Sequence, residues 1–140
     1  MLVLDTNVVA EMMRAAPDER VRAWLDGQAA ARLFVTTITK AEIRHGIARL
    51  PEGQRKASLA AAADRVFGEL FRGRVLAFDT EAADAYAAIA AEREASGHPI
   101  TTLDCQIAAI ARVHGAAVAT RNVKDFSGCG VAVVNPWESA

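Results

Sequence analysis

The 140-residue chain contains only two cysteines, Cys105 and Cys129, and their separation matches no metal-ligand spacing. Two cysteines are too few for a disulfide scaffold. Cys105 lies in an apolar run of helical character, so we expect a buried free thiol and a reducing, cytoplasmic environment. No run of about 18 apolar residues occurs, which predicts that the chain does not span a membrane. The start, Met1–Asp5, lacks a basic segment, and we expect no signal peptide.

An excess of charge of either sign is also absent. There are 16 Lys and Arg residues against 17 Asp and Glu residues, so the formal net charge is −1. Strong binding to nucleic acid through overall charge is therefore excluded, and a local patch or a metal must hold any such partner. The chain is instead rich in apolar residues, at 52%, and its length is typical of one domain. We predict a single folded domain over residues 1–140.

Several common catalytic motifs are missing. The three histidines, His45, His98 and His114, have no zinc-ligand spacing. No G-x-S-x-G nucleophile elbow occurs, and no arrangement suggests a serine or cysteine nucleophile. Neither type of glycine-rich phosphate loop, G-x-G-x-x-G or G-x-x-x-x-G-K-[ST], is present, which argues against a nucleotide cofactor.

Short apolar runs alternate with amphipathic stretches along the chain. The apolar runs predict strands at 2–4, 33–37, 75–78, 117–120 and 131–134. The amphipathic stretches predict helices near 8–13, 18–27, 39–50, 54–72, 81–96 and 102–115. Such alternation indicates an α/β fold with a mainly parallel sheet. Leu59, Val66, Leu70 and Leu103 are among the apolar residues expected to face the core.

Acidic residues follow the predicted strands. Asp5 ends the first strand, Glu42 lies about a turn beyond the second, Asp104 opens the helix that precedes the fourth, and Asp125 follows that strand. Sites in open α/β sheets form beyond the carboxyl ends of the strands. Carboxylates that share one edge repel each other unless a divalent cation lies among them, and oxygen ligands suit Mg²⁺ or Mn²⁺. This pattern predicts phosphodiester hydrolysis by a metal-activated water.

Each carboxylate also has a purely structural explanation. Asp5 can cap the first helix. Glu42 completes a capping box begun by Thr39, and Asp104 can complement a helix dipole. Asp125 can belong to a turn. Only their convergence on one edge of the sheet favours the functional interpretation.

Basic residues lie near the same edge. Arg121 and Lys124 flank Asn122, and Arg44 lies two residues beyond Glu42. These side chains can hold phosphates beside a metal. They can equally be solvated or pair with nearby acids.

Four segments carry a specific resemblance: LVLDTNVVAE, TTITKAEIRHGIARL, TTLDCQIAAIARVHGAAVATRNVKDF and VAVVNPWE. In their order and spacing they resemble a PIN domain of the VapC/FitB type, the toxins of bacterial toxin–antitoxin pairs, from Met1 to about Trp137. The resemblance implies a parallel sheet of four or five strands flanked by helices. It also implies an endoribonuclease that depends on Mg²⁺ or Mn²⁺ and acts on tRNA, rRNA or mRNA.

The resemblance assigns roles to particular residues. Asp5, Glu42 and Asp104 match the three core acids of the family, which implies that they are catalytic and bind the metal. Thr6 and Asn7 complete the DTN motif, whose polar side chains help to set the geometry of the first acid.

The fourth acidic position departs from the family pattern. Many relatives carry an acid where this chain has Asn122, while Asp125 supplies another acid nearby. The resemblance therefore implies one metal site and leaves a second open, with Asp125 as a supporting catalytic residue. We assign substrate binding to Asn7, Arg121, Asn122 and Lys124.

The resemblance also implies partners: a cognate antitoxin, promoter DNA reached only through that antitoxin, and a second copy of the chain in a homodimer. Met12, Met13 and Trp24 can line a groove for the antitoxin or pack in the core. Two functions stay open. One is a metal-dependent ribonuclease toxin. The other is a non-catalytic binding module that acts through an antitoxin–DNA complex, which Asn122 favours. A phosphatase-like hydrolase is less favoured, because a D-x-D nucleophile motif is absent.

Overall fold

The computed structural model describes residues 1–138, in which strands and helices alternate. In chain order the elements are β1 (Leu2–Leu4), α1 (Thr6–Met12), α2 (Glu19–Asp26), a 3₁₀ turn (Ala30–Arg32), β2 (Leu33–Thr36), α3 (Thr37–Ala48), α4 (Gln54–Arg65), a π-helical segment (Val66–Leu70), β3 (Val75–Leu76), α5 (Thr80–Ala95), α6 (Thr102–Val113), β4 (Ala117–Ala119), α7 (Val123–Phe126) and β5 (Val133–Val134). In this described part, no helix is long and apolar enough to cross a membrane.

The strands of residues 1–138 form one parallel sheet in the order β3-β2-β1-β4-β5. β1 lies at its centre, where Leu2 is in register with Leu33 of β2 on one side and with Ala117 of β4 on the other. Because all strands run the same way, their carboxyl ends meet at one edge of the sheet, where Asp5 and Thr120 directly follow two of them. The predicted α/β fold with a parallel sheet is confirmed.

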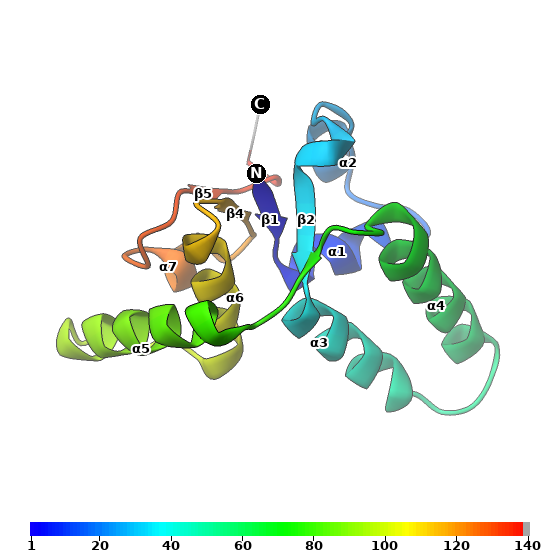
Figure 1. The fold of residues 1–140 in the computed structure, drawn as a ribbon. Coiled ribbons are helices and arrows are strands. Elements are labelled where there is room, and N and C mark those ends of the chain that lie inside the picture. Colours follow the sequence, from blue (N-terminus) through cyan, green and yellow to red (C-terminus); the bar gives the residue numbers. More distant parts are fainter. Residues whose placement is uncertain (139–140) are drawn as a thin grey trace.

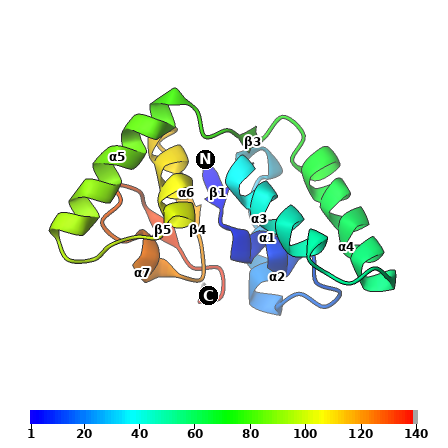
Figure 2. The same cartoon turned by 90° about the horizontal axis from the view of Figure 1, so that it is seen from below.

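Helices cover both faces of the sheet (Figures 1 and 2). Helices α1 to α4 lie on one side, and α5, α6 and α7 lie on the other. Alternate side chains of a strand point to opposite faces. Leu2 and Leu4 therefore belong to the core beneath α1 and α3, whereas Val3 packs in the second core with residues of α6 such as Ile107. Every residue of β1 is buried, as expected for a central strand.

Helix α3 begins two residues earlier than expected. Thr36, the last residue of β2, is its N-cap, and the Thr36 hydroxyl oxygen accepts a hydrogen bond from the Thr39 amide at 3.1 Å. The predicted start at Thr39 is therefore wrong, because the capping hydroxyl is supplied three residues upstream. Glu42 consequently lies in the second turn of α3 rather than in a capping box.

The helix predicted over residues 54–72 changes its hydrogen-bonding pattern partway. Regular α4 ends at Arg65, and the Phe71 amide then donates to the Val66 carbonyl, the five-residue step of a π-helix. The wider turn changes which side chains face the core. Phe71 is buried and Leu70 is 50% exposed, so the prediction of Leu70 as a core residue is wrong.

The prediction that Leu103 faces the core is also wrong, because Leu103 is 45% exposed. Thr101 caps α6, and the helix turns Cys105, Ile107 and Ile110 inward while Leu103 points to solvent.

Strands β3 and β5 have two residues each and are shorter than predicted. Cys105 is a buried free thiol, as expected, and Cys129 is buried and free as well.

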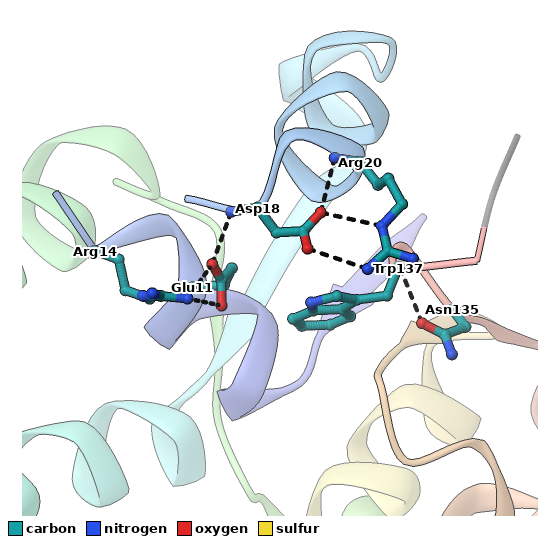
Figure 3. Close-up of polar contacts among 6 residues, drawn as sticks. All are labelled: Glu11, Arg14, Asp18, Arg20, Asn135 and Trp137. Atoms are coloured by element: carbon teal, nitrogen blue, oxygen red, sulfur yellow. Dashed lines mark hydrogen bonds and ion pairs between the residues drawn. The ribbon is translucent and has the colours of Figure 1, made fainter. Parts of the chain in front are cut away.

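A buried glutamate fixes the connection between α1 and α2 (Figure 3). The Glu11 carboxylate accepts hydrogen bonds from the Arg14 guanidinium at 2.9 and 3.2 Å and from the Asp18 amide at 2.8 Å. Asp18 in turn caps α2 and accepts bonds from Arg20. This arrangement explains why a charged side chain is buried in α1, since its oxygens satisfy donors that would otherwise lack partners.

Candidate functional site at the carboxyl edge of the sheet

Asp5 lies at the carboxyl end of the central strand and is only 4% exposed. One carboxylate oxygen, Oδ1, accepts a hydrogen bond from the Thr6 amide at 2.8 Å, and the residue caps α1. The other, Oδ2, accepts a bond from the Thr120 hydroxyl at 2.7 Å. Capping is thus one role of Asp5, and the bond to Thr120 shows that the carboxylate also faces the residue that follows β4.

Glu42 joins the same neighbourhood from α3. Its Oε1 accepts a hydrogen bond from the Thr6 hydroxyl at 2.8 Å, and the Thr6 hydroxyl also lies 3.0 Å from that of Thr39. Glu42 makes this contact across 36 positions of the chain. Its side chain is therefore held beside the first residue of α1.

Thr120 connects the DTN segment to the TRN segment. Besides donating to Asp5, its hydroxyl oxygen accepts bonds from the Asn122 amide at 3.0 Å and from the side-chain amide of Asn7 at 3.3 Å. The Arg121 amide donates back to Asn7 Oδ1 at 3.3 Å. These contacts fix the two segments against each other, and sequence reasoning did not anticipate the central place of Thr120.

Asp104 and Asp125 lie next to each other on α6 and α7. Asp104 is half-buried in the first turn of α6, where the Thr101 hydroxyl accepts from its amide at 3.3 Å, and Asp125 is exposed. Burial raises the pKa of Asp104, as does the charge of Asp125, while the Thr101 hydroxyl and the charge of Arg93 lower it. Two carboxylates thus share this part of the edge.

The charge at Asp5 is strongly disfavoured. Burial raises the pKa of Asp5 to about 6, even though the bonds from Thr120 and Thr6 lower it, and the charges of Asp104 and Glu42 add to the rise. No cationic side chain among residues 1–138 forms an ion pair with Asp5. Asp5 is therefore close enough to Asp104 and Glu42 for their charges to disfavour its own, and it has no cationic partner among the described residues.

This donor set fits a magnesium ion that keeps part of its water. In the described residues, no three Asp, Glu, His or Cys side chains are gathered closely enough to hold a metal by themselves. Mg²⁺ commonly retains several waters and binds through one or two carboxylates plus substrate phosphate. Asp5 and Asp104 can supply two such carboxylates, and Glu42 lies beside Thr6, the residue that follows Asp5.

The basic residues near the edge are placed differently from one another. The Arg121 guanidinium lies 5.1 Å from the centre of the buried Trp137 ring, a cation–π contact. Lys124 is exposed and has no ion pair in the described part of the chain. Both residues line a cavity of about 460 Å³ together with Asn122. Arg44 instead pairs with Asp64 at 2.7 Å, which is the structural alternative considered for it.

A buried arginine supports the Asp125 segment and escaped sequence reasoning. Arg93, in the last turn of α5, is 8% exposed. Its Nη1 donates to the backbone carbonyls of Asp125 at 3.0 Å and Ser127 at 2.7 Å, and its Nε donates to the carbonyl of His98 at 2.6 Å. Arg93 therefore holds α7 and the following turn against α5.

Comparison with known proteins places this geometry in a family. The PIN domain family model matches residues 2–127. The chain is 43% identical over 143 residues to the VapC ribonuclease Y4jK of Sinorhizobium fredii, with all of both chains covered. It is 42% identical over 137 residues to toxin FitB of Neisseria gonorrhoeae, covering 98% of this chain and 99% of FitB.

Solved structures of related proteins have the same fold as this chain. The structure of FitAB bound to an IR36 DNA fragment contains a chain with a TM-score of 0.93 and 41% identity, covering 100% of this chain and 98% of that one. FitAcB from Neisseria gonorrhoeae has a TM-score of 0.88 at 38% identity, covering 99% of this chain and 100% of that one. The chain belongs to the PIN-domain family and is related to its VapC and FitB toxins.

Proposed function

We propose that this protein is a Mg²⁺-dependent endoribonuclease, the toxin of a toxin–antitoxin pair. The observation that carries the proposal is the buried Asp5 carboxylate, which lies among the charges of Asp104 and Glu42 and has no cationic partner in residues 1–138. A site of this kind is costly for an unliganded protein and becomes favourable when a divalent cation binds. The name of the Sinorhizobium fredii relative, a VapC ribonuclease, supports RNA as the substrate.

The residues would divide the work as follows. Asp5 and Asp104 would hold Mg²⁺ or Mn²⁺, and Glu42 would bind the metal or a water on it. Bound Mg²⁺ would supply Lewis-acid polarisation of a phosphoryl oxygen and a lowered pKa of water. Asn122 can orient a water but adds no charge, so Asp125 is the remaining acid near Asp104.

The basic and amide side chains would bind the substrate. The side-chain amide of Asn7 and the backbone amide of Asn122 both donate to the Thr120 hydroxyl. Arg121 and Lys124 line the adjacent cavity together with Asn122. Their cationic groups can pair with phosphates on either side of the bond to be cleaved.

We also propose a cognate antitoxin as partner, with promoter DNA bound only through it, a homodimeric toxin and a cytoplasmic location. The related FitAB was solved as a complex bound to DNA. An apolar cavity of about 250 Å³, lined by Ala10, Met13, Ile47 and Leu59, is a candidate groove for the antitoxin. Met12 and Trp24 pack against the core.

The test is cleavage of total RNA by the purified chain, freed of any antitoxin. We expect cuts that require Mg²⁺ or Mn²⁺, disappear in EDTA and leave 5′-phosphate and 3′-hydroxyl ends. Absence of cleavage and of metal binding at millimolar Mg²⁺ would contradict the proposal. It would favour the alternative, a non-catalytic module that acts through an antitoxin–DNA complex, for which Asn122 in place of an acid is the supporting observation.

Replacing Thr120 by valine should shift the pH dependence of cleavage. The Thr120 hydroxyl lowers the pKa of Asp5, so its loss raises that pKa further above 6. Cleavage needs the carboxylate, and the acidic limb of the rate–pH profile should therefore move about one unit to higher pH. Thr120→Ser keeps the hydroxyl and should restore the original limb. Identical profiles for the valine and serine variants would contradict this role of the hydroxyl.

A further inference from the structure

A second cavity, of about 560 Å³, lies between the end of α5 and the α7 segment. Arg93, Ser96 and His98 line it from the end of α5 and the following turn, and Lys124 and Ser127 line it from α7 and the residue after it. We call it the α5–α7 cavity. Its volume is within the range of about 300–1,000 Å³ that small-molecule sites occupy in proteins.

The α5–α7 cavity adjoins the candidate site. Lys124 lines both this cavity and the cavity that contains Arg121 and Asn122. Arg93, in the wall of the α5–α7 cavity, donates to the backbone of Asp125, and its charge acts on Asp104. A chain-like ligand that passes the carboxylates can therefore continue across α7 into the second cavity.

The chemistry of the lining suits a phosphate and a ribose. Among residues 1–138, Lys124 forms no ion pair and the His98 imidazole makes no hydrogen bond. The Ser96 hydroxyl donates to the Arg93 carbonyl at 3.0 Å and keeps lone pairs free for a ribose hydroxyl. Glu92, the acid of the lining, lies 3.8 Å from Arg112, which offsets its charge.

The wall of the cavity is also preorganised. Arg93 is buried, and its guanidinium reaches carbonyls on both sides of the cavity, at His98 and at Ser127. The backbone of the wall is thereby fixed before a ligand arrives, so binding does not have to order it. Nothing in the hydrolytic arrangement at Asp5 requires this second cavity.

We propose that the α5–α7 cavity is a nucleotide subsite, which holds one phosphate–ribose unit of the RNA strand at a distance from the bond that is cleaved. This inference rests on the proposed ribonuclease function. It extends that function, because it assigns the path that the bound RNA strand takes beyond Asp5 and Asp104. The recognised unit is single-stranded, since the cavity has room for one nucleotide rather than for a helix.

Charge changes at Ser96, which is exposed at the end of α5, test the subsite. Affinity for a fluorescein-labelled single-stranded RNA is measured by anisotropy in EDTA, so that no cleavage occurs. We expect Ser96→Glu to weaken binding and Ser96→Lys to strengthen it, each about two- to fivefold, as exposed charge pairs do. Ala61→Glu and Ala61→Lys are the matched controls, because Ala61 is exposed on α4 beyond the opposite face of the sheet (Figure 2).

A second pair of variants guards against a folding defect at Ser96. His98→Ala removes an imidazole from the cavity and should also weaken RNA binding, whereas His114→Ala, at the exposed end of α6, should not. Melting temperatures within a few degrees of wild type show that each variant is folded.

The outcomes separate the two proposals. If the Ser96 and Ala61 pairs change affinity equally, or if His98→Ala binds RNA as wild type does, the subsite is overturned while Mg²⁺-dependent cleavage by the wild type stands. If the wild type neither binds nor cleaves RNA, both proposals fail.

Discussion

The Asp5→Asn variant should lose RNA cleavage almost completely while becoming more stable at neutral pH. Asparagine keeps the shape of the side chain and removes the charge that would bind Mg²⁺. Metal-ion catalysis supplies several kcal/mol to a hydrolysis of this type, so we expect the rate to fall by about a thousandfold or more. The measurement is cleavage of a defined RNA at saturating Mg²⁺, with growth arrest on expression as a second readout.

The gain in stability follows from the raised pKa of Asp5. The native pKa of about 6 lies above the ordinary value of 3.8 for an aspartate, so the native state binds the proton more tightly than the unfolded state does. Below pH 4 Asp5 is protonated in both the native and the unfolded state, so its burial does not lower the free energy of unfolding. Above pH 6 the buried charge costs up to roughly 3 kcal/mol of unfolding free energy, which the neutral asparagine avoids.

Urea unfolding of the wild type and of Asp5→Asn measures the difference in their free energy of unfolding. We expect this difference at pH 7.5 and none at pH 4. Asp84→Asn is the control, since Asp84 is an exposed aspartate on α5 that loses the same charge. Added Mg²⁺ should narrow the gap by stabilising only the wild type. An Asp5→Asn protein that cleaves RNA at the wild-type rate would overturn the assignment.

The Arg93→Met variant should be strongly destabilised and should cleave RNA poorly. Methionine fills a similar volume but leaves the carbonyls of His98, Asp125 and Ser127 without the guanidinium donors. Hydrogen bonds to charged groups contribute about 1.5–3 kcal/mol, so we expect a loss of about 3 kcal/mol. For a chain of this size that lowers the melting temperature by roughly 10 °C.

Activity should fall for a separate reason. Without Arg93 the α7 segment is no longer held beside Asp104, and the charge that lowers the pKa of Asp104 is gone. The acidic limb of the rate–pH profile should move to higher pH. Arg93→Lys keeps the positive charge but has fewer hydrogen-bond donors. It should therefore bring the acidic limb of the profile back toward its wild-type position while recovering less of the lost stability. A methionine variant with unchanged melting temperature and unchanged profile would show that Arg93 supports neither.

Sequence patterns predicted the sheet because its strands are short apolar runs, and the central strand β1 is buried on both faces. Asp5 could be placed at the edge because it directly follows such a strand. Leu70 could not be placed correctly, because a π-helical turn shifts the face that the helix buries. Shifts of this kind depend on hydrogen bonds that no local periodicity records.

Contacts between distant segments explain what else was missed. Glu42 fits a capping box by its neighbours in sequence, yet its partner is Thr6, which lies 36 positions away. Arg93 sits in an alanine-rich helix and resembles any solvent-exposed arginine until α7 is packed over it. The roles of Asp5, Glu42, Asp104 and Asp125 in catalysis stay predictions, and the structure shows only their surroundings.

The central place of β1 has a consequence for the newly made chain. Its neighbours in the sheet are β2 and β4, and β4 begins only at Ala117. During translation Asp5 is therefore synthesised long before Thr120, which donates a hydrogen bond to it in the folded chain. A nascent chain therefore has its first acid but neither the complete sheet nor the bond from Thr120, so the edge that holds Asp5 is completed only when synthesis is nearly finished.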